Sequence, residues 1–276
     1  MVIAAINDDK LIEVVSAVQQ EICSISSEEA LRQVWNEKEE LEELLRKHRP
    51  TLMVGGNIGF GKTTVASIIG TYGKIKEIRE PVETNPLLDL YYSNMWEYNE
   101  RMQLDAMNTR LYDIILTQQK YPNQPLIFDR THYEDLYIFC ETLTAAGIMK
   151  ESQKKFCDWY FKMKLNQLEC RHKVRLAPDM IIFLQGDIET GWKRIHSRDR
   201  PMEVRKDAGK GVGLTPEFYA SLHSQYETFP KRVREIYKGH ILTLPQDTVE
   251  VADATNSKGQ LYVVKSVKEA LKVVYE

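Results

Sequence analysis

A glycine-rich stretch of ten residues constrains this chain more than any other feature of its sequence. Residues 55–64 read GGNIGFGKTT, and the pattern G-x-x-x-x-G-K-[ST] runs within them from Gly56 to Thr63. An apolar run at 51–54 precedes the stretch, and a run typical of a helix at 64–69 follows it. A strand, a glycine-rich turn and a helix in this order predict a phosphate-binding loop, the P-loop.

Each kind of residue in this loop has a physical role. Glycines let the backbone fold tightly, so that N–H groups bind phosphate oxygens, and the following helix adds its positive N-terminal end. Lys62 is expected to reach the β- and γ-phosphates of ATP, and the Thr63 hydroxyl to ligate Mg²⁺. The residues expected to hold the nucleotide are Gly56, Asn57, Ile58, Gly59, Phe60, Gly61, Lys62, Thr63 and Thr64.

Length, charge and cysteine content exclude several classes of protein. The 276 residues allow one large α/β domain with or without an appendage, and the net charge of −3 provides no basic field for nucleic acid. No apolar run is long enough to cross a bilayer, and the first ten residues lack the pattern of a signal or transit peptide. The four cysteines are widely spaced, which favours reduced thiols in a cytoplasmic protein and argues against a zinc site.

Short apolar segments alternate with helical patterns from residue 51 onwards. This alternation predicts an α/β fold with a doubly wound parallel sheet of five strands, covered by helices on both faces. The strands are expected at 51–54, 75–79, 125–128, 180–184 and 241–244. The helices are expected at 97–120, 134–146, 151–171, 188–197 and 216–238, and the tail is expected to hold a strand at 260–264 and a helix at 267–275.

Residues 1–49 predict an N-terminal helical hairpin placed ahead of a domain at 50–276. Ser26 and Glu29 form the S-x-x-E signature that opens the second helix, and Pro50 blocks its continuation. The apolar stripes are Leu11, Ile12, Val14, Val15 and Val18 in the first helix, and Leu31, Val34, Trp35, Leu41, Leu44 and Leu45 in the second. Such stripes usually pack on the core, and the alternative is a docking or oligomerisation arm.

Charged residues follow two of the predicted strands. Glu80 follows the strand at 75–79, and Asp129 and Arg130 follow the strand at 125–128. Ligands of an open parallel sheet collect at the carboxyl ends of its strands, so these side chains are expected on the same edge as the P-loop. Phosphoryl transfer needs a proton acceptor, a metal and cations, for which Glu80, Asp129 and Arg130 respectively are candidates.

A cationic helix end and a glycine-rich segment predict a small Arg-rich lid at about 194–214. Arg194 and Arg198 are four residues apart, so they share one face of a helix. Three glycines among charged residues follow at 204–213. A segment of this kind can close over a triphosphate and exclude water.

Several motifs of the chain keep a characteristic order and spacing. They are Gly56-Asn57-Ile58, Glu80-Pro81-Val82, the spacing of Tyr92, Gln103 and Arg110, Asp129-Arg130-Thr131 with Tyr133 and Asp135, and Arg194, Arg198, Arg200 and Glu203. Together, from about residue 51 to about 235, they resemble the deoxynucleoside kinases, the family of deoxycytidine, deoxyguanosine and deoxyadenosine kinases. The resemblance implies transfer of a phosphoryl group from Mg²⁺–ATP to the 5′-hydroxyl of a deoxynucleoside, and a homodimer built through the helices at 97–120 and 151–171.

The resemblance also implies roles for individual side chains. Glu80 resembles the base, Arg130 the arginine that holds the hydroxyl and the transition state, and Asp129 the carboxylate that organises Mg²⁺ with Thr63. The side chains that resemble the substrate contacts are Tyr92 and Glu203 at the 3′-hydroxyl, and Gln103, Arg110 and Asp135 at the base. Arg194 and Arg198 resemble the lid arginines, which with Lys62 complete the catalytic set.

The preferred base stays open at this stage. An aspartate held by Arg110 would accept a hydrogen bond from the amino group of adenine or cytosine, whereas the arginine itself could face a guanine carbonyl. The segments 129–135 and 85–88 resemble those of bacterial purine deoxynucleoside kinases, and therefore lean towards a purine.

Two other functions compete with this interpretation. A deoxynucleoside monophosphate kinase similar to thymidylate kinases would need a cation at the acceptor phosphate, for which Arg79, Arg101 and Arg130 are candidates. Thymidylate kinases usually have glycine where this chain has Val82. A nucleotide-binding protein without catalysis is the other alternative, and the presence of Glu80 and the lid arginines argues against it.

Overall fold

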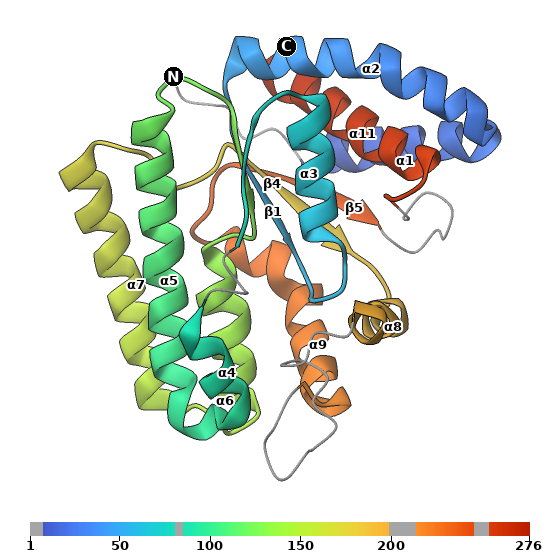
Figure 1. Ribbon diagram of the computed structural model, residues 1–276. Helices are drawn as coiled ribbons and strands as arrows, with labels where there is room; N and C mark the ends of the chain where they lie inside the picture. The colour runs from blue at the N-terminus through green and yellow to red at the C-terminus, as the bar shows by residue number, and fades with distance from the viewer. Residues whose placement is uncertain (1–7, 81–84, 199–213, 246–253) are drawn as a thin grey trace.

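The computed structural model describes residues 8–80, 85–198, 214–245 and 254–276, and a five-stranded sheet lies at its centre (Figure 1). All strands are parallel, and their order is β2-β3-β1-β4-β5. The strands are β1 (Thr51–Gly56), β2 (Lys76–Ile78), β3 (Leu126–Asp129), β4 (Met180–Gln185) and β5 (His240–Pro245). The predicted fold class and its five strands are therefore confirmed.

The central strand places the P-loop beside the charged end of its neighbour. Val54 of β1 pairs with Asp129 of β3, and Gly56 pairs with Leu184 of β4. Successive residues of β1 point to opposite faces, so that Leu52 packs in one apolar core and Met53 in another. Because the sheet is covered on both faces, its strands read as apolar runs without alternation.

One face of the sheet carries the helices that surround the cleft described below. They are α4 (Pro86–Ser93), α5 (Met95–Lys120), the π-helix η1 (Asp135–Cys140), α6 (Glu141–Ala145), α7 (Glu151–His172) and α9 (Pro216–Val233). The helix expected at 134–146 is thus a π-helical turn followed by a short α-helix, and the one expected at 216–238 ends at Val233. A further helix, α8 (Ile188–Arg198), packs against α9.

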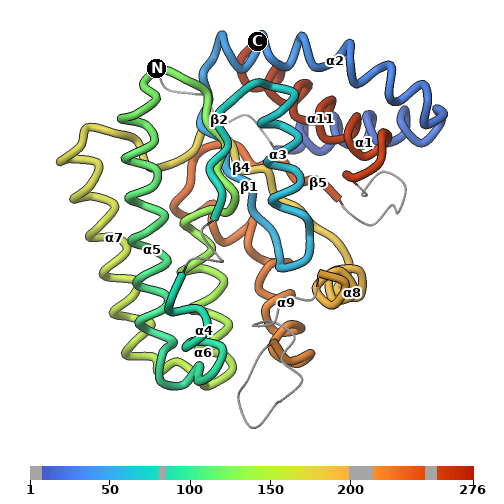
Figure 2. Tube along the Cα trace, in the orientation of Figure 1, coloured from blue at the N-terminus to red at the C-terminus, as the bar shows by residue number. Residues whose placement is uncertain are grey.

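The other face is covered by the P-loop helix and by helices from both ends of the chain. They are α3 (Lys62–Tyr72), α1 (Asp8–Ser24), α2 (Ser27–His48) and α11 (Ser257–Tyr275). Figures 1 and 2 show α1, α2 and α11 together at one corner of the molecule, and α11 packs on both of the others. Residues about 230 positions apart in the sequence therefore share one apolar core with the P-loop helix.

The strand expected at 260–264 is wrong, because this segment belongs to α11. The Asn256 side chain accepts a hydrogen bond from the Gly259 N–H and caps a helix that continues to Tyr275. Leu261, Val263 and Val264 are fully buried, as in a strand between two layers. A short run of β-branched residues does not distinguish a buried strand from a helix that is buried on most sides.

The apolar stripes of the N-terminal helices pack on the core of the protein, apart from three residues. Ser26 caps α2 as predicted, since its hydroxyl accepts a hydrogen bond from the Glu29 N–H. Ile12, Leu31 and Trp35 are exposed, and the remaining stripe residues are buried or half-buried. The packing interpretation therefore accounts for most of each stripe, and a division of the chain at residue 49 stays a prediction.

Among the helices of the described ranges, none combines the length and the apolar character that crossing a bilayer needs.

Candidate active site

A cleft of about 650 Å³ opens at the carboxyl ends of β1, β2 and β3, and it gathers most of the predicted site. The catalytic, metal and substrate candidates that line it are Lys62, Thr63, Glu80, Tyr92, Gln103, Arg110, Asp129, Arg130, Asp135, Arg194 and Arg198. Ile58, Gly59, Gly61 and Thr64 of the P-loop line it too, whereas Gly56, Asn57 and Phe60 lie in the loop without lining the cleft. Glu203 lies outside the described residues.

The P-loop has a backbone conformation that glycine permits. Gly59 has a φ of +86°, and a Cβ there would lie 2.4 Å from the carbonyl oxygen of Gly191 on α8. The Tyr219 hydroxyl of α9 donates a hydrogen bond to the Ile58 carbonyl oxygen at 2.8 Å. The loop is therefore held against the helix that carries Arg194 and Arg198, and no larger residue fits at Gly59.

Lys62 is buried at the floor of this loop. Its Nζ donates hydrogen bonds to the carbonyl oxygens of Gly56 and Asn57, at 2.8 and 2.9 Å. Burial and the nearby Arg130 guanidinium lower the pKa of Lys62 to about 8, against the opposing effect of three carboxylates. An anionic ligand would restore the charged ammonium, because an opposite charge favours the ionised form.

Thr63 and Asp129 form the pair that was expected to hold a metal. The Thr63 hydroxyl donates to Oδ2 of Asp129 at 2.5 Å, and Oδ1 of Asp129 is buried without a hydrogen-bond partner among the described residues. Within the described residues, no three or more His, Cys, Asp or Glu side chains are placed together so that they could hold a metal ion. A hydroxyl and one carboxylate suit Mg²⁺, which keeps several waters and takes its remaining ligands from phosphates.

Glu80 lies between two arginines in the middle of the cleft, where its phosphate-binding end adjoins its aromatic end. Its Oε1 accepts a hydrogen bond from Arg110 Nη2 at 2.9 Å, and its Oε2 accepts one from Arg130 Nε at 3.0 Å. Burial acts to raise the pKa of Glu80, but the two guanidinium groups outweigh it and hold the pKa well below its usual range. The carboxylate is consequently ionised and able to accept a proton.

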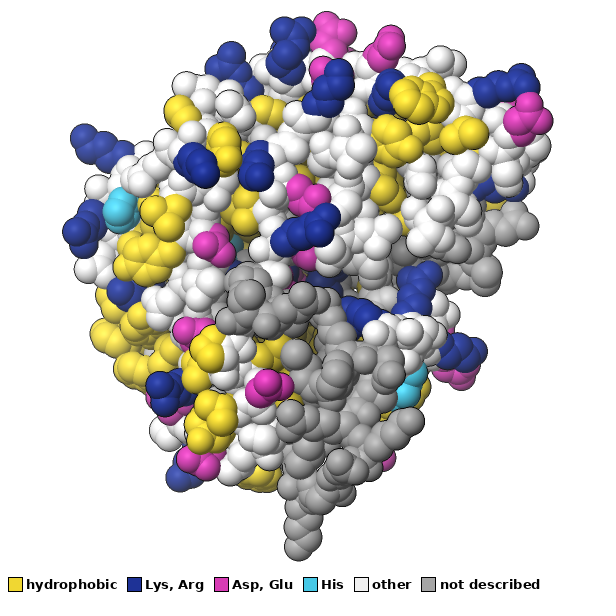
Figure 3. Space-filling view, viewed as in Figure 1, with side chains coloured by type: hydrophobic (Ala, Val, Ile, Leu, Met, Phe, Trp, Pro, Cys, Tyr) yellow, Lys and Arg dark blue, Asp and Glu magenta, His cyan; other side chains and the backbone are white. Residues whose placement is uncertain are grey.

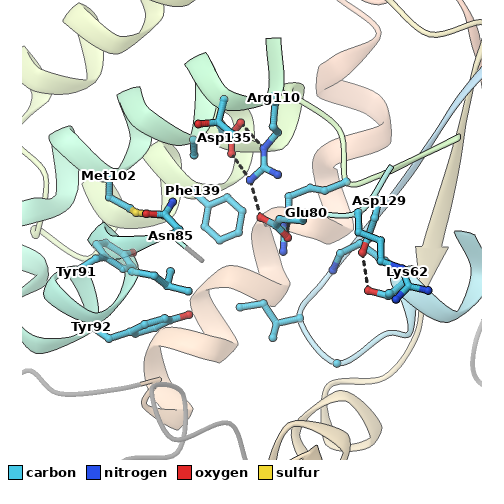
Figure 4. A pocket seen from close by; sticks show the side chains of 18 of the residues that line it. Lys62, Glu80, Asn85, Tyr91, Tyr92, Met102, Arg110, Asp129, Asp135 and Phe139 are labelled. Carbon is cyan, nitrogen blue, oxygen red and sulfur yellow. Dashed lines mark hydrogen bonds and ion pairs between the residues drawn. The ribbon is translucent and has the colours of Figure 1, made fainter. Parts of the chain in front are cut away.

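Arg110 bonds to Glu80 on one side and to Asp135 on the other (Figure 4). Its Nε and Nη2 donate to the two oxygens of Asp135, at 2.8 and 3.0 Å, in a fork-to-fork pair. Burial raises the pKa of the Asp135 carboxyl against the lowering effect of Arg110. The predicted pairing of Arg110 with Asp135 is thus present, and it extends to Glu80.

The far end of the cleft is lined by aromatic rings, thioether and amide groups. Figure 4 shows Tyr91, Tyr92 and Met102 at this end, opposite Lys62 and Asp129. Gln103 is buried and lines the cleft with them. Flat apolar walls with one amide and one Arg–Asp pair form a site that can enclose a planar heterocycle and read its edge.

Glu134 is a structural part of the site that the sequence analysis did not assign. It is fully buried, and its oxygens accept hydrogen bonds from the Gly56 N–H at 3.1 Å, the Thr131 N–H at 2.8 Å and the Tyr226 hydroxyl at 2.7 Å. Tyr226 also accepts from Arg130 Nη1 at 3.2 Å. The spacing of four residues between Arg130 and Glu134 could have indicated that the two side chains pair. Nothing in the local sequence singles out Tyr226.

Arg130 has a backbone conformation that is rare for its residue type. Its φ is +86°, in the left-handed region. Its guanidinium group bonds to Glu80 and to Tyr226 and lies 5.0 Å from the centre of the Phe139 ring. Such a conformation persists where the surroundings fix it, and it aims this side chain along the edge of the sheet.

The other arginines proposed for an acceptor phosphate do not converge on the cleft. Arg101 is exposed and does not line it. Arg79 lines the rim but is two-thirds exposed and donates to Glu77 at 2.7 Å. Of the three candidates, Arg130 alone is buried in the site, where Glu80 already pairs with it.

Comparisons with known proteins agree with this geometry. A deoxyguanosine kinase of Lactobacillus acidophilus is 29% identical over 211 residues, which cover 73% of this chain and 87% of the relative. A deoxyadenosine kinase of the same organism is 25% identical over 227 residues, which cover 81% and 97%. A solved deoxyadenosine kinase from M. mycoides, with products dCMP and a flexible dCDP bound, has the same fold, with a TM-score of 0.58 and 23% identity over 80% of this chain and 99% of that one.

A family model also matches most of the chain. Residues 52–272 match the family model described as deoxynucleoside kinase, and they include the whole sheet except Thr51 and all the described residues of the cleft. The match also includes most of α11, beyond the end of the sequence motifs near residue 235. The chain therefore belongs to the deoxynucleoside kinase family.

Proposed function

We propose that this protein transfers a phosphoryl group from Mg²⁺–ATP to the 5′-hydroxyl of a deoxynucleoside, preferably a purine, and yields a deoxynucleoside 5′-monophosphate and ADP. The observation that carries the proposal is the position of Glu80. Its carboxylate lies where the phosphate-binding end of the cleft meets the aromatic end, between Arg110 and Arg130. An acceptor hydroxyl placed there would have a base and a cation beside it.

The proton-transfer step is assigned to Glu80. Its pKa is held low by the two arginines, so the carboxylate is ionised before substrate binds. As the phosphorus–oxygen bond to the acceptor forms and the bond to ADP breaks, the hydroxyl proton passes to a Glu80 oxygen. A weak base suffices because the transition state is loose and the hydroxyl loses its proton late.

Charge stabilisation is assigned to the cations around the P-loop. Lys62 would bind the β- and γ-phosphates, Arg130 the transferred group, and Arg194 and Arg198 the triphosphate from α8. Mg²⁺ would be held by Thr63 and Asp129 and would neutralise charge on the phosphates.

Substrate selection is assigned to the aromatic end. Tyr92, which is buried against the cleft, would lie against the sugar and leave little room for a 2′-hydroxyl. Gln103, Arg110 and Asp135 would read the base edge, and the names of the relatives above support a purine.

A phosphorylation panel tests the proposal. The enzyme is offered Mg²⁺–ATP with each of four deoxynucleosides, the four ribonucleosides and the four deoxynucleoside monophosphates, and the products are identified by mass. We expect turnover of deoxyguanosine or deoxyadenosine to the monophosphate, with the ribonucleosides much slower. Turnover of monophosphates alone, or ATP binding with no turnover of any acceptor, would contradict it.

We further propose a homodimer formed through α5 and α7. The large exposed apolar side chains of these helices are Trp96, Tyr112, Leu116, Phe156 and Trp159. Apolar side chains gather along the left edge of Figure 3, where α5 and α7 lie in Figure 1. A patch of this kind usually marks an interface, and a second copy would bury it in a bundle of four helices.

Light scattering after gel filtration tests the dimer. Trp159→Glu should give a monomer, because a charge would be buried in the interface. Trp35→Glu on α2 is the matched control, since Trp35 is 55% exposed against 58% for Trp159. A wild-type monomer, or a dimer that survives Trp159→Glu and dissociates with Trp35→Glu, would overturn the assignment.

A cytoplasmic role in nucleotide salvage is the setting we propose for the enzyme.

A further inference from the structure

A second, much smaller cavity lies behind the catalytic carboxylate. Its volume is about 20 Å³, and its polar lining includes Arg110, Asp113, Asp129 and His132. Its other walls are apolar side chains of β1, β2, β3 and α5, together with Arg79, Glu80 and Arg130. A cavity needs about 10–15 Å³ to accept one water molecule, so this volume suits a single water.

His132 is the unexplained group at this cavity. It is 1% exposed, and neither ring nitrogen has a hydrogen-bond partner among the described residues. Its ring packs on Tyr133, with centroids 4.1 Å apart, and near Phe161. Burial and the nearby Arg110 charge lower its pKa to about 3, so that the ring is neutral, with one nitrogen as donor and the other as acceptor.

Asp129 supplies the second unsatisfied group. Its Oδ2 accepts a hydrogen bond from the Thr63 hydroxyl, but its buried Oδ1 lacks a hydrogen-bond partner in the described part of the chain. Asp129 borders both the cleft and the small cavity. A buried polar atom without a hydrogen bond costs about 1–3 kcal/mol, and a buried water is the usual way in which proteins avoid this cost.

We infer that one buried water fills this cavity, bonds to His132 and to Oδ1 of Asp129, and makes His132 a positioning residue for the carboxylate that faces the metal. Arg110 can donate to the same water and Asp113 can accept from it, so the site offers the two to four polar partners that a buried water needs. The inference rests on the proposed kinase function for its consequence, but the water site itself does not depend on activity.

The consequence is an oriented Asp129. A carboxylate that is held at one oxygen by Thr63 and at the other through water cannot rotate away from the phosphate end of the cleft. Residues that orient a metal ligand in this way typically affect metal affinity by about 10- to 100-fold when they are removed. His132 would therefore influence Mg²⁺ affinity without touching the deoxynucleoside.

A crystal structure of the enzyme without metal and nucleotide is the first test, because it does not require turnover. We expect density for one water within hydrogen-bond distance of a His132 ring nitrogen and of Asp129 Oδ1, and its loss in His132→Leu. A cavity without water, or a water that bonds to neither residue, would overturn the inference even if the enzyme is an active kinase.

The dependence on Mg²⁺ is the second test. In His132→Leu we expect Mg²⁺-dependent ATP binding, measured by calorimetry, to need about tenfold more Mg²⁺, with an unchanged KM for the deoxynucleoside. His132→Gln should recover part of this loss, because its amide can bond to the same water. Wild-type Mg²⁺ dependence in both variants would overturn the positioning role. If His132→Leu does not fold, His132→Gln and the wild-type crystal still decide.

Discussion

Two networks of charged side chains stabilise different parts of this protein, and they differ in how exposed their carboxylates are. Between α2 and α11, the buried Lys268 pairs with Glu37, Glu40 and Glu269, whose side chains are 15%, 46% and 31% exposed. In the cleft, Glu80 pairs with two arginines, and Glu134 of the same network is fully buried. Glu40 can exchange its partners for solvent at little cost, whereas the buried Glu134 relies on the members of its own network for compensation.

The difference explains why only the buried network is suited to catalysis. Charges in a site of low dielectric act strongly on one another and on any ligand that enters. A substrate hydroxyl can replace one of the arginine contacts of Glu80 and interact favourably with the arginine that remains. At the α2–α11 surface, Glu40 is 46% exposed, so water competes for contacts of this kind.

The largest expected effect is on turnover, with Glu80→Gln. The amide cannot accept the hydroxyl proton, so kcat should fall by about 10²- to 10⁴-fold while ATP binding persists. Glu77→Gln is the matched control, because Glu77 lies on β2 three residues before Glu80, bonds to Ser67 and Arg79, and does not line the cleft. Steady-state kinetics and calorimetry check both; near-normal turnover of Glu80→Gln would remove Glu80 as the base.

Next in size is the effect of a single carboxylate on stability in the two networks. Glu134→Gln removes a buried charge beside Arg130 and turns an amide towards backbone N–H donors, so unfolding free energy should drop by about 3 kcal/mol. Glu40→Gln should lower it by less than about 1 kcal/mol. Urea denaturation measures both, and equal losses would erase the distinction between the networks.

A proton-uptake measurement sharpens the comparison at Lys62. Its pKa of about 8 means that near pH 8 about half of the free enzyme lacks this proton, and phosphate binding should restore it. Titration with Mg²⁺–ATP in buffers of different ionisation enthalpy should report uptake of about half a proton at pH 8 and almost none near about pH 6.5. Lys62→Arg, whose guanidinium stays protonated, should remove the uptake. Identical proton counts at the two pH values would contradict the lowered pKa.

The smallest effect concerns acid stability at the α2–α11 surface. Hydrogen bonds from Lys272 and Lys268 lower the pKa of Glu40 from its ordinary value of 4.5. A lowered folded-state pKa means that the contribution to stability is present above the unfolded-state pKa and is lost as the pH falls through the folded-state value. Wild-type protein should therefore lose slightly more unfolding free energy than Glu40→Gln between about pH 5 and pH 3. A larger loss in the variant would reverse the sign and refute the assignment.

Much of the fold could be predicted because its signals are local. The P-loop needs particular glycines, and buried parallel strands are apolar runs, so both appear in a single sequence. The strand wrongly expected at 260–264 shows the limit, since its nature depends on α1 and α2 packing around it. The exposure of Trp35 likewise follows from which face of α2 meets α11, which the stripe alone does not specify.

The site was predictable where chemistry constrains residue type. Glu80, Asp129 and Arg130 stand at strand ends, where the topology brings them to one edge. Tyr226 could not be predicted, because its contact with Glu134 joins residues that are 92 positions apart. The link from Arg110 to Glu80 was missed for the same reason, although both residues were assigned individually.

The position of α11 has a consequence for the order in which the protein folds. Lys268 bonds to Glu40 across 228 positions, so α1 and α2 leave the ribosome long before the helix that covers their apolar stripes. Contacts of such high sequence separation form slowly, and exposed stripes invite aggregation meanwhile. We expect a chain that stops before residue 257 to bind a hydrophobic dye and aggregate; a soluble and cooperatively folded product would disprove this dependence on the last helix.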